Sequence, residues 1–276
     1  MKIGIIGLGL IGGSLGLCLK DMKLISGVYG YDISKENEKL ALELGLVHEI
    51  VSFEEMKEKC SVIFLAIPVE AIVETLQNLK DIDSKTTIID LGSTKAKIIL
   101  SCPKEIRPNL VAAHPMAGTE HSGPKAAFKE LLKDAVVVIC DDDRTGEMHL
   151  KRAIEIFSHS GMRIVFMDAL KHDHHVAIIS HLPHVVSYAL VNSVLKEENR
   201  RNIINLAGGS FSDVGRIAKS SPEMWSDIFK QNKQNVINAV DAFRKELDIC
   251  EEMIENDRWS ELEEWLGDAR VIREFL

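Results

Sequence analysis

The 276-residue sequence has few cysteines and no excess of positive charge. Its five cysteines are scattered and form no CxxC pair, which argues against disulfides and against a structural zinc site, and is typical of a reducing cytoplasm. The formal net charge is −9, and no segment has the basic stripe of a nucleic-acid-binding protein. We therefore expect a cytoplasmic protein with no nucleic-acid partner.

Long apolar runs are also missing. The longest, such as VIFLAIPV, fall far below the roughly 20 residues of a membrane-spanning helix. The N-terminus MKIGIIGLG has neither a continuous apolar core nor a cleavage site, so it does not match a signal peptide. Apolar residues make up 46% and charged residues 27%, the balance of an ordinary globular protein. The sequence predicts no membrane partner and has the length for two modest domains.

Residues 1–167 alternate short β-like runs with helix-like segments. Several runs are apolar at every position, as expected of parallel strands covered on both faces, and SFEE (Ser52 to Glu55) has the form of a capping box. The expected strands are 2–7, 27–32, 61–68, 86–92, 109–114, 135–140 and 162–167, and the expected helices are 34–44, 53–59, 69–80, 94–101 and 147–159. This alternation predicts an α/β domain of the Rossmann type with a doubly wound parallel sheet.

Residues 168–276 predict an all-helical second domain. The expected helices are 170–195, 198–207, 210–219, 223–255 and 258–275. The stretch MWSDIFKQNKQNVINAVDAF keeps an apolar stripe at three-to-four spacing over many turns. A small helical domain has little else in its own chain to cover such a stripe. We therefore expect the helical domain to bind substrate and to form a homodimer.

The motif GLGLIG follows the first expected strand and opens a helix. In a dinucleotide-binding turn, Gly7 permits the tight turn, Gly9 lets the backbone approach the pyrophosphate, and Gly12 allows close helix–sheet packing. Leu10 and Ile11 begin the helix, whose free N–H groups and dipole attract phosphates. The alternative is a nucleotide-type fold that holds no dinucleotide.

Asp32 ends the second expected strand, twenty residues after Gly12. A carboxylate there accepts a hydrogen bond from the adenosine ribose 2′-hydroxyl and repels a 2′-phosphate, which favours NAD over NADP, although Lys35 nearby weakens that preference. Pro68 follows a later strand. It either walls the nicotinamide side of the site or simply starts the next helix.

Two adjacent strand ends carry polar groups. Ser93 lies in DLGSTKAKI and His114 in AAHPMAGTEHSG, so both side chains are expected at the carboxyl edge of the sheet, where open sheets bind ligands. The alternatives are structural: Thr94 caps the next helix, Lys95 is a solvated first-turn charge, and His114 is a loop histidine held in place by Pro115.

The segment HDHHVAIISHLPH is rich in histidine. It contains His172, His174, His175, Ser180, His181 and His184. No carboxylate arrangement such as HExxH accompanies them, so we expect no metal site. The first three histidines have a simple alternative as exposed residues on the helix surface. Pro183 predicts a kink that turns His181 or His184 toward the cleft.

A glycine- and serine-rich segment, LAGGSFSDVGRIAKSSPEMW, contributes Arg216 and Trp225. Arg216 either pairs with Asp213 within its helix or binds a substrate carboxylate with its planar fork. Trp225 is either part of the core or the wall of an apolar pocket. Together these groups describe an NAD enzyme, with a histidine base and a carboxylate-binding arginine, that oxidises a hydroxylated, anionic small molecule.

The set GLGLIGGS, DLGSTK, AAHPMAGTEHSG, SHLPH and GGSFSDVGRIAKSSPEMW strongly resembles the prephenate/arogenate dehydrogenases of tyrosine biosynthesis, in order and over essentially the whole chain. The resemblance implies oxidative decarboxylation of prephenate to 4-hydroxyphenylpyruvate with NAD⁺, or of arogenate to tyrosine.

The resemblance also implies roles for single residues. His114 would accept the hydroxyl proton, Ser93 would bond the same hydroxyl and help hold His114, and Arg216 would bind a substrate carboxylate. The implied pocket residues are Ser180, His184 and Trp225 in its lining and Thr119 and Glu120 near its mouth. One departure is Gly215, which stands where the family usually has threonine or a similar residue.

Two other functions fit parts of the sequence. A β-hydroxyacid dehydrogenase has the same two-part layout, but it uses a lysine at a glycine-rich helix start that this sequence lacks. The second is a non-catalytic NAD-binding or dimerising protein.

Overall fold

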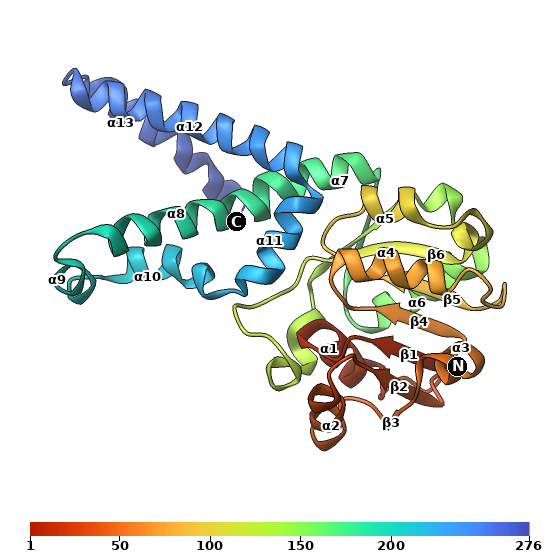
Figure 1. Ribbon diagram of the computed structural model, residues 1–276. Helices are drawn as coiled ribbons and strands as arrows, with labels where there is room; N and C mark the ends of the chain where they lie inside the picture. Colours follow the sequence, from red (N-terminus) through yellow and green to blue (C-terminus); the bar gives the residue numbers. More distant parts are fainter. Residues whose placement is uncertain (276) are drawn as a thin grey trace.

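A computed structural model describes residues 1–275 and shows an α/β domain followed by a set of helices that extends away from it (Figure 1). The sheet has eight strands in the order β3-β2-β1-β4-β5-β6-β7-β8. The strands are β1 Lys2–Ile6, β2 Gly27–Tyr31, β3 Glu49–Ile50, β4 Val62–Leu65, β5 Thr87–Asp90, β6 Leu110–Pro115, β7 Val136–Cys140 and β8 Arg163–Met167. The predicted Rossmann-type architecture is confirmed, with β3 as an additional short strand at one edge.

The sheet is parallel from β3 to β6, but β7 runs antiparallel to β6 and β8 runs parallel to β7. The predicted parallel sheet is therefore parallel-dominated, with one antiparallel pair at this edge. A parallel neighbour needs a crossover, usually a helix, whereas residues 116–135 between β6 and β7 contain only two short 3₁₀ turns, Pro124–Ala126 and Lys129–Leu132. The chain consequently returns beside β6 in the opposite direction.

Helices cover both faces of the sheet. They are α1 Leu10–Leu19, α2 Lys35–Glu43, α3 Phe53–Lys59, α4 Val69–Asn78, α5 Ala96–Ser101 and α6 Glu147–His159. Leu15 of α1 and Phe157 of α6 belong to one apolar cluster, while Ile72 of α4 and Ile98 of α5 belong to the other. The fully apolar strands supply side chains to both clusters, which is the reason their sequences do not alternate. The predicted capping box of α3 is present.

The helical region begins with one continuous helix, made of α7 Ala169–Val176, a π-helical turn Ala177–His181 and α8 Leu182–Lys196. A π-helical turn lies just before Pro183, where the sequence predicts a kink, and in it the Leu182 N–H bonds the Ala177 carbonyl. Proline has no N–H for the ordinary helical bond to the residue four before it, so the helix widens just ahead of Pro183.

The remaining helices are α9 Arg200–Asn205, α10 Gly209–Arg216, α11 Pro222–Gln231, α12 Lys233–Glu255 and α13 Trp259–Asp268. The helix predicted over 223–255 was wrong, because the chain breaks at Asn232 between α11 and α12. The Asn232 side chain donates to the Asp173 carbonyl at 2.6 Å, and its amide nitrogen lies 3.3 Å from His181 Nδ1. These contacts to the continuous helix Ala169–Lys196 stabilise the break at Asn232, which apolar periodicity alone does not reveal.

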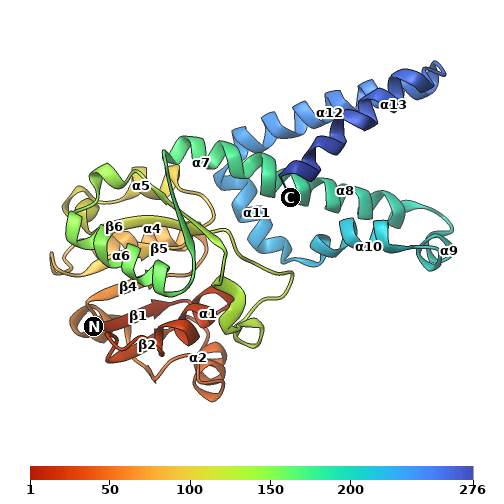
Figure 2. The same cartoon turned by 180° about the vertical axis from the view of Figure 1, so that it is seen from behind.

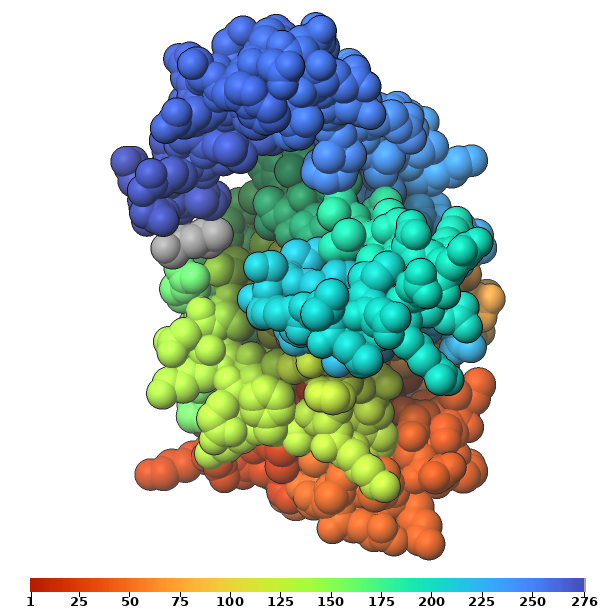
Figure 3. All heavy atoms as spheres, turned by 90° about the vertical axis from the view of Figure 1, so that its left-hand side faces the viewer, coloured from red at the N-terminus to blue at the C-terminus, as the bar shows by residue number. Residues whose placement is uncertain are grey.

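The helical region is elongated. In Figures 1 and 2, α8 to α10 and the pair α12–α13 form two arms that point away from the sheet. Figure 3 shows a hollow between these arms, and a groove between α8 and α12 is lined in part by Ile178, Leu182 and Phe243. Large apolar side chains are exposed along both arms, including Leu190, Leu247 and Ile254. The described chain leaves this apolar surface uncovered.

Candidate functional site

The glycines of GLGLIG have three different surroundings at the carboxyl end of β1. Gly7 has a backbone φ of +92°, which residues other than glycine rarely adopt. A Cβ on Gly12 would lie 1.9 Å from the Gly7 carbonyl oxygen, whereas a Cβ on Gly9 would meet nothing within 4 Å. Gly9 is the N-cap of α1, so the first-turn N–H groups from Leu10 onward lack helical acceptors and border that open space. This geometry fits a bound pyrophosphate.

Asp32 lies beside this turn at the end of β2 and is mostly buried. One carboxylate oxygen accepts the Leu8 N–H at 2.8 Å, and the other accepts the Ser34 N–H at 2.9 Å. The Lys35 ammonium pairs with Glu38 at 2.8 Å, so its charge is already engaged by a carboxylate. Asp32 is thus fixed against the glycine turn, as ribose recognition requires.

Pro68 is exposed and serves as the N-cap residue of α4, directly after β4. Its position agrees with the helix-start alternative, and it also lies at the carboxyl edge of the sheet.

His114 is half-buried near the end of β6, and its ring bonds a second histidine. His114 Nδ1 lies 2.9 Å from His172 Nε2, and His172 Nδ1 lies 2.8 Å from Asp173 Oδ1. Burial, together with the neighbouring His172 and Lys95, holds the pKa of His114 well below the usual range of histidine. His114 is therefore a neutral proton acceptor at neutral pH.

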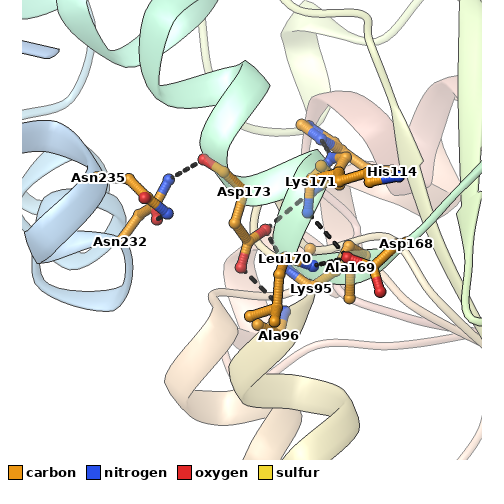
Figure 4. A network of polar contacts seen from close by, with 12 residues as sticks. Lys95, Ala96, His114, Asp168, Ala169, Leu170, Lys171, Asp173, Asn232 and Asn235 are labelled. Atoms are coloured by element: carbon orange, nitrogen blue, oxygen red, sulfur yellow. Dashed lines mark hydrogen bonds and ion pairs between the residues drawn. The ribbon is translucent and has the colours of Figure 1, made fainter. Parts of the chain in front are cut away.

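Asp173 joins the helical region to the α/β domain. Its Oδ1 also accepts the Lys95 N–H at 2.8 Å, and its Oδ2 accepts the Ala96 N–H at 2.9 Å. Figure 4 shows Asp173 between the start of α5 on one side and Asn232 on the other. These bonds fix α7 against the loop that follows β5.

Lys95 is completely buried, so its interpretation as a solvated charge was wrong. Its ammonium bonds Asp90 Oδ1 at 2.5 Å and the Ala113 carbonyl at 2.7 Å, next to His114 in the chain. Burial raises the pKa of Asp90, against the effect of the Lys95 charge. Thr94 does not cap α5, and its buried hydroxyl has no partner among the described residues.

Ser93 lies half-buried on the loop between β5 and α5. Among the hydrogen bonds of residues 1–275, His172 and not Ser93 is the partner of His114. The expected bond by which Ser93 helps to hold His114 is therefore absent from the described residues.

Trp225 of α11 is 7% exposed and packs against two histidines of the continuous helix Ala169–Lys196. Its ring stacks on His184 with centroids 3.5 Å apart and meets His181 edge-on at 5.9 Å. His184 Nδ1 lies 2.9 Å from the Ser180 carbonyl, so this ring is held from both sides. Burial lowers the pKa of His181 to about 4. These contacts bring Trp225, His184 and the Ser180 backbone together.

Arg216 at the end of α10 pairs with Glu120, on the loop after β6, at 3.0 Å. The alternative of a pair with Asp213 was wrong, since no such ion pair is present among residues 1–275. Burial lowers the pKa of His184, and the Arg216 charge lowers it further. Thr119 is exposed beside this pair. A Cβ on Gly215 would make only an ordinary contact, so the departure at this position does not strain α10.

The sequence interpretation missed four buried polar groups around His114, namely Asp90, Lys95, His172 and Asp173. All four stand inside quoted segments, DLGSTKAKI and HDHHVAIISHLPH, and the alternative of His172 as an exposed helix-surface histidine was wrong, because it is 1% exposed. Their role depends on burial, and burial cannot be predicted from a short sequence motif. Within residues 1–275, no group of three or more histidine, cysteine, aspartate or glutamate side chains is arranged to hold a metal ion.

Comparisons with known proteins match both parts of the chain. A family model described as "Prephenate dehydrogenase, nucleotide-binding domain" matches residues 15–166, and one described as "Prephenate dehydrogenase, dimerization domain" matches residues 168–268. The prephenate dehydrogenase of Bacillus subtilis is 32% identical and the match covers 98% of this chain and 74% of that protein. The cyclohexadienyl dehydrogenase of Zymomonas mobilis is 34% identical, with 89% and 85% covered.

Two solved structures are similar over nearly their whole length. The A. aeolicus prephenate dehydrogenase, solved with hydroxyphenyl propionate and NAD⁺, has a TM-score of 0.92 at 31% identity, with 99% of this chain and 97% of that chain covered. The Synechocystis arogenate dehydrogenase has a TM-score of 0.81 at 28% identity, with 99% of each chain covered.

Proposed function

The chain belongs to the prephenate dehydrogenase family, and from that membership and the geometry around His114 we propose that it converts prephenate and NAD⁺ to 4-hydroxyphenylpyruvate, CO2 and NADH in tyrosine biosynthesis. The observation that carries the proposal is a neutral histidine at the carboxyl edge of a sheet whose first turn is shaped for a dinucleotide. A histidine base and a hydride acceptor are the two components that alcohol oxidation requires.

The cofactor, when bound, accepts a hydride from the ring carbon that carries the hydroxyl group. Its pyrophosphate fits the open space at Gly9 and the free N–H groups at the start of α1, and its ribose hydroxyl fits Asp32. The Asp32 carboxylate repels a 2′-phosphate, and the Lys35 ammonium pairs with Glu38, which together support NAD.

His114 takes the hydroxyl proton on Nε2 while the electron pair of the broken O–H bond forms a carbonyl. The bond from the ring to its carboxylate then breaks, its electron pair makes the ring aromatic, and the phenolate oxygen takes a proton back from His114. Because aromatisation makes this sequence strongly downhill, the protein mainly has to orient the substrate and move one proton. Ser93, at the adjacent strand end, is proposed to bond the same hydroxyl.

Substrate anchoring is assigned to the helical region. Arg216 is half-exposed and already binds a carboxylate, that of Glu120, so a substrate carboxylate can take that place. The stacked pair of Trp225 and His184 offers an aromatic wall for the substrate ring, with Ser180 behind it. Thr119 and Glu120 lie on the loop after β6, and Glu120 connects that loop to Arg216.

Arogenate is the second candidate substrate. It differs from prephenate by an amino group in place of the side-chain keto group, and the Synechocystis relative with a TM-score of 0.81 is an arogenate dehydrogenase. The chemistry at His114 is the same for both substrates, so this choice depends on contacts to the side chain.

We place the domain boundary between residues 167 and 168, so that the helical region is a separate domain. The chain is proposed to form a homodimer through this helical domain. The exposed apolar residues along α8 and α12 and the groove between these helices support a second copy as the cover. The description of the matching family model as a dimerization domain supports the same partner.

The helix Ala169–Lys196 is long and apolar enough by composition to cross a membrane. Its buried His172, Asp173 and His181, with their bonds to the sheet domain and to Asn232, support a place inside a folded protein instead. With all five cysteines free, we propose a cytoplasmic enzyme without a membrane partner.

The test is a spectrophotometric assay of NADH formation with prephenate and with arogenate, each with NAD⁺ and NADP⁺. We expect the highest kcat/KM with prephenate and NAD⁺, with one CO2 released for each NADH. NADH formation without CO2 would point to an ordinary alcohol dehydrogenase, and no NADH with either substrate would contradict the proposal.

A further inference from the structure

A chain of buried polar side chains leads from His114 into the helical region. His172 is 1% exposed and Asp173 is 5% exposed, and both lie on α7, while His114 lies on β6. Burying two polar groups at a domain junction is unfavourable unless they are hydrogen-bonded, and here each one is. The other histidines of α7, His174 and His175, are exposed.

The bonds of Asp173 determine where the protons lie. Two backbone N–H groups, of Lys95 and Ala96, donate to its two oxygens, so both oxygens are acceptors and the group is a carboxylate. The contact between His172 Nδ1 and Asp173 Oδ1 therefore requires a proton on Nδ1. In neutral His172, Nε2 is then an acceptor, and the remaining contact requires a proton on His114 Nδ1.

This proton order leaves His114 Nε2 as the nitrogen with a free lone pair. Lys95 is buried in the same cluster, and its ammonium is paired with Asp90. Lys95 also holds the Ala113 carbonyl, so the backbone beside His114 and the ring of His114 are both fixed.

We propose that His172 and Asp173 are positioning residues of the reaction, which fix His114 in the tautomer that presents Nε2 as the proton acceptor. The kinetic part of this inference rests on the proposed function. His172 does not need to touch the substrate: its effect passes through the Nδ1–H of His114. The same bond stays in place when His114 becomes an imidazolium, so the geometry is kept through the proton transfer.

The experiment compares His172→Phe, His172→Gln and the control His175→Gln. Phenylalanine keeps a ring but cannot accept a hydrogen bond, so His114 loses its fixed tautomer and we expect kcat to fall about 10²-fold with little change in KM for prephenate. The glutamine carbonyl can accept the Nδ1–H, so His172→Gln is expected to recover at least 10-fold of that loss. The exposed His175→Gln should match the unchanged enzyme.

A second measurement does not depend on activity or on the variants. In ¹⁵N-histidine spectra near pH 8, the signals of His114, assigned by their loss in His114→Gln, should show a protonated Nδ1 and an unprotonated Nε2. A proton on Nε2 in the unchanged protein would overturn the proposal, even if His172→Phe fails to fold. Unchanged kcat in folded His172→Phe, a rise only in KM, or equal losses in both His172 variants would overturn it too. If the unchanged enzyme forms no NADH, the proposed function fails, while the spectra still test the tautomer.

Discussion

Arg216 Nη1 lies 3.0 Å from Glu120 Oε2, although 96 residues separate the two side chains. The pair links α10 to the loop that follows the strand of His114. With 54% of the Arg216 side chain exposed, this ion pair contributes little to stability. An exposed guanidinium that already binds one carboxylate can instead exchange it for another.

Arg216→Ala is therefore expected to raise KM for prephenate at least 10-fold, with kcat nearly unchanged, since the lost contact is made in the ground state and the transition state alike. Asp213→Asn on the same helix is the matched control, because Asp213 is exposed and has no ion pair with Arg216 in the described chain. Steady-state kinetics at saturating NAD⁺ gives both constants. An unchanged KM in Arg216→Ala would remove this residue from the pocket.

His114→Asn is expected to lower kcat at least 10²-fold while NAD⁺ binding, measured by calorimetry, survives. The exposed His175→Asn serves as the control. The pKa of His114 is lowered well below its usual value, so the neutral base persists as the pH falls through the ordinary histidine range. The acid limb of kcat/KM should accordingly lie below pH 6.5, the unperturbed histidine value. Near-normal turnover in His114→Asn, or an acid limb above that pH, would contradict the assignment.

Gly9 and Gly12 provide a matched pair of substitutions in one motif. Gly12→Ala would place a Cβ 1.9 Å from the Gly7 carbonyl oxygen, so we expect a loss of several kcal/mol of folding stability. Gly9→Ala meets no atom of the protein within 4 Å, so its Tm should remain close to that of the unchanged protein while the Kd for NAD⁺ rises at least 10-fold. Unaltered NAD⁺ affinity in Gly9→Ala would show that the open space is not the phosphate site.

Patterns that depend on local chain geometry were readable from the sequence. The glycine turn, the fully apolar strands and the capping box at Ser52 each have a local physical cause, and all are present. The sheet edge was not readable in the same way, because the direction of β7 depends on how residues 116–135 return and no short motif encodes that path.

The network around His114 shows the same limit within the site. Lys95 and His172 have the sequence surroundings of surface residues, since each stands at or near a helix start among polar neighbours. Only the packing of α7 against the loop after β5 buries them and brings them to His114. Asn232 is a further case. The helical pattern breaks there because Asn232 contacts His181 and Asp173, which lie 51 and 59 positions earlier in the chain.

Asp32→Asn is expected to reduce the preference for NAD⁺ over NADP⁺ by at least 10-fold in kcat/KM, since the amide no longer repels a 2′-phosphate. One such factor corresponds to about 1.4 kcal/mol of differential binding. Lys35→Ala is the control, because its ammonium is held by Glu38 and should contribute little to either cofactor. A preference that stays constant in Asp32→Asn would mean that another group selects the cofactor.

Phe243→Asp should convert the proposed dimer to a monomer, because it introduces a charge into the groove between α8 and α12, whose lining is mainly apolar. Burying an unpaired carboxylate at an interface is strongly unfavourable. Lys80→Asp, on the exposed surface of the sheet domain, introduces the same side chain outside the groove and should leave the mass unchanged. Light scattering during size-exclusion chromatography measures both. If the unchanged chain has the mass of a monomer, the exposed apolar arms need another cover, and if Phe243→Asp stays dimeric, the interface lies elsewhere on the molecule.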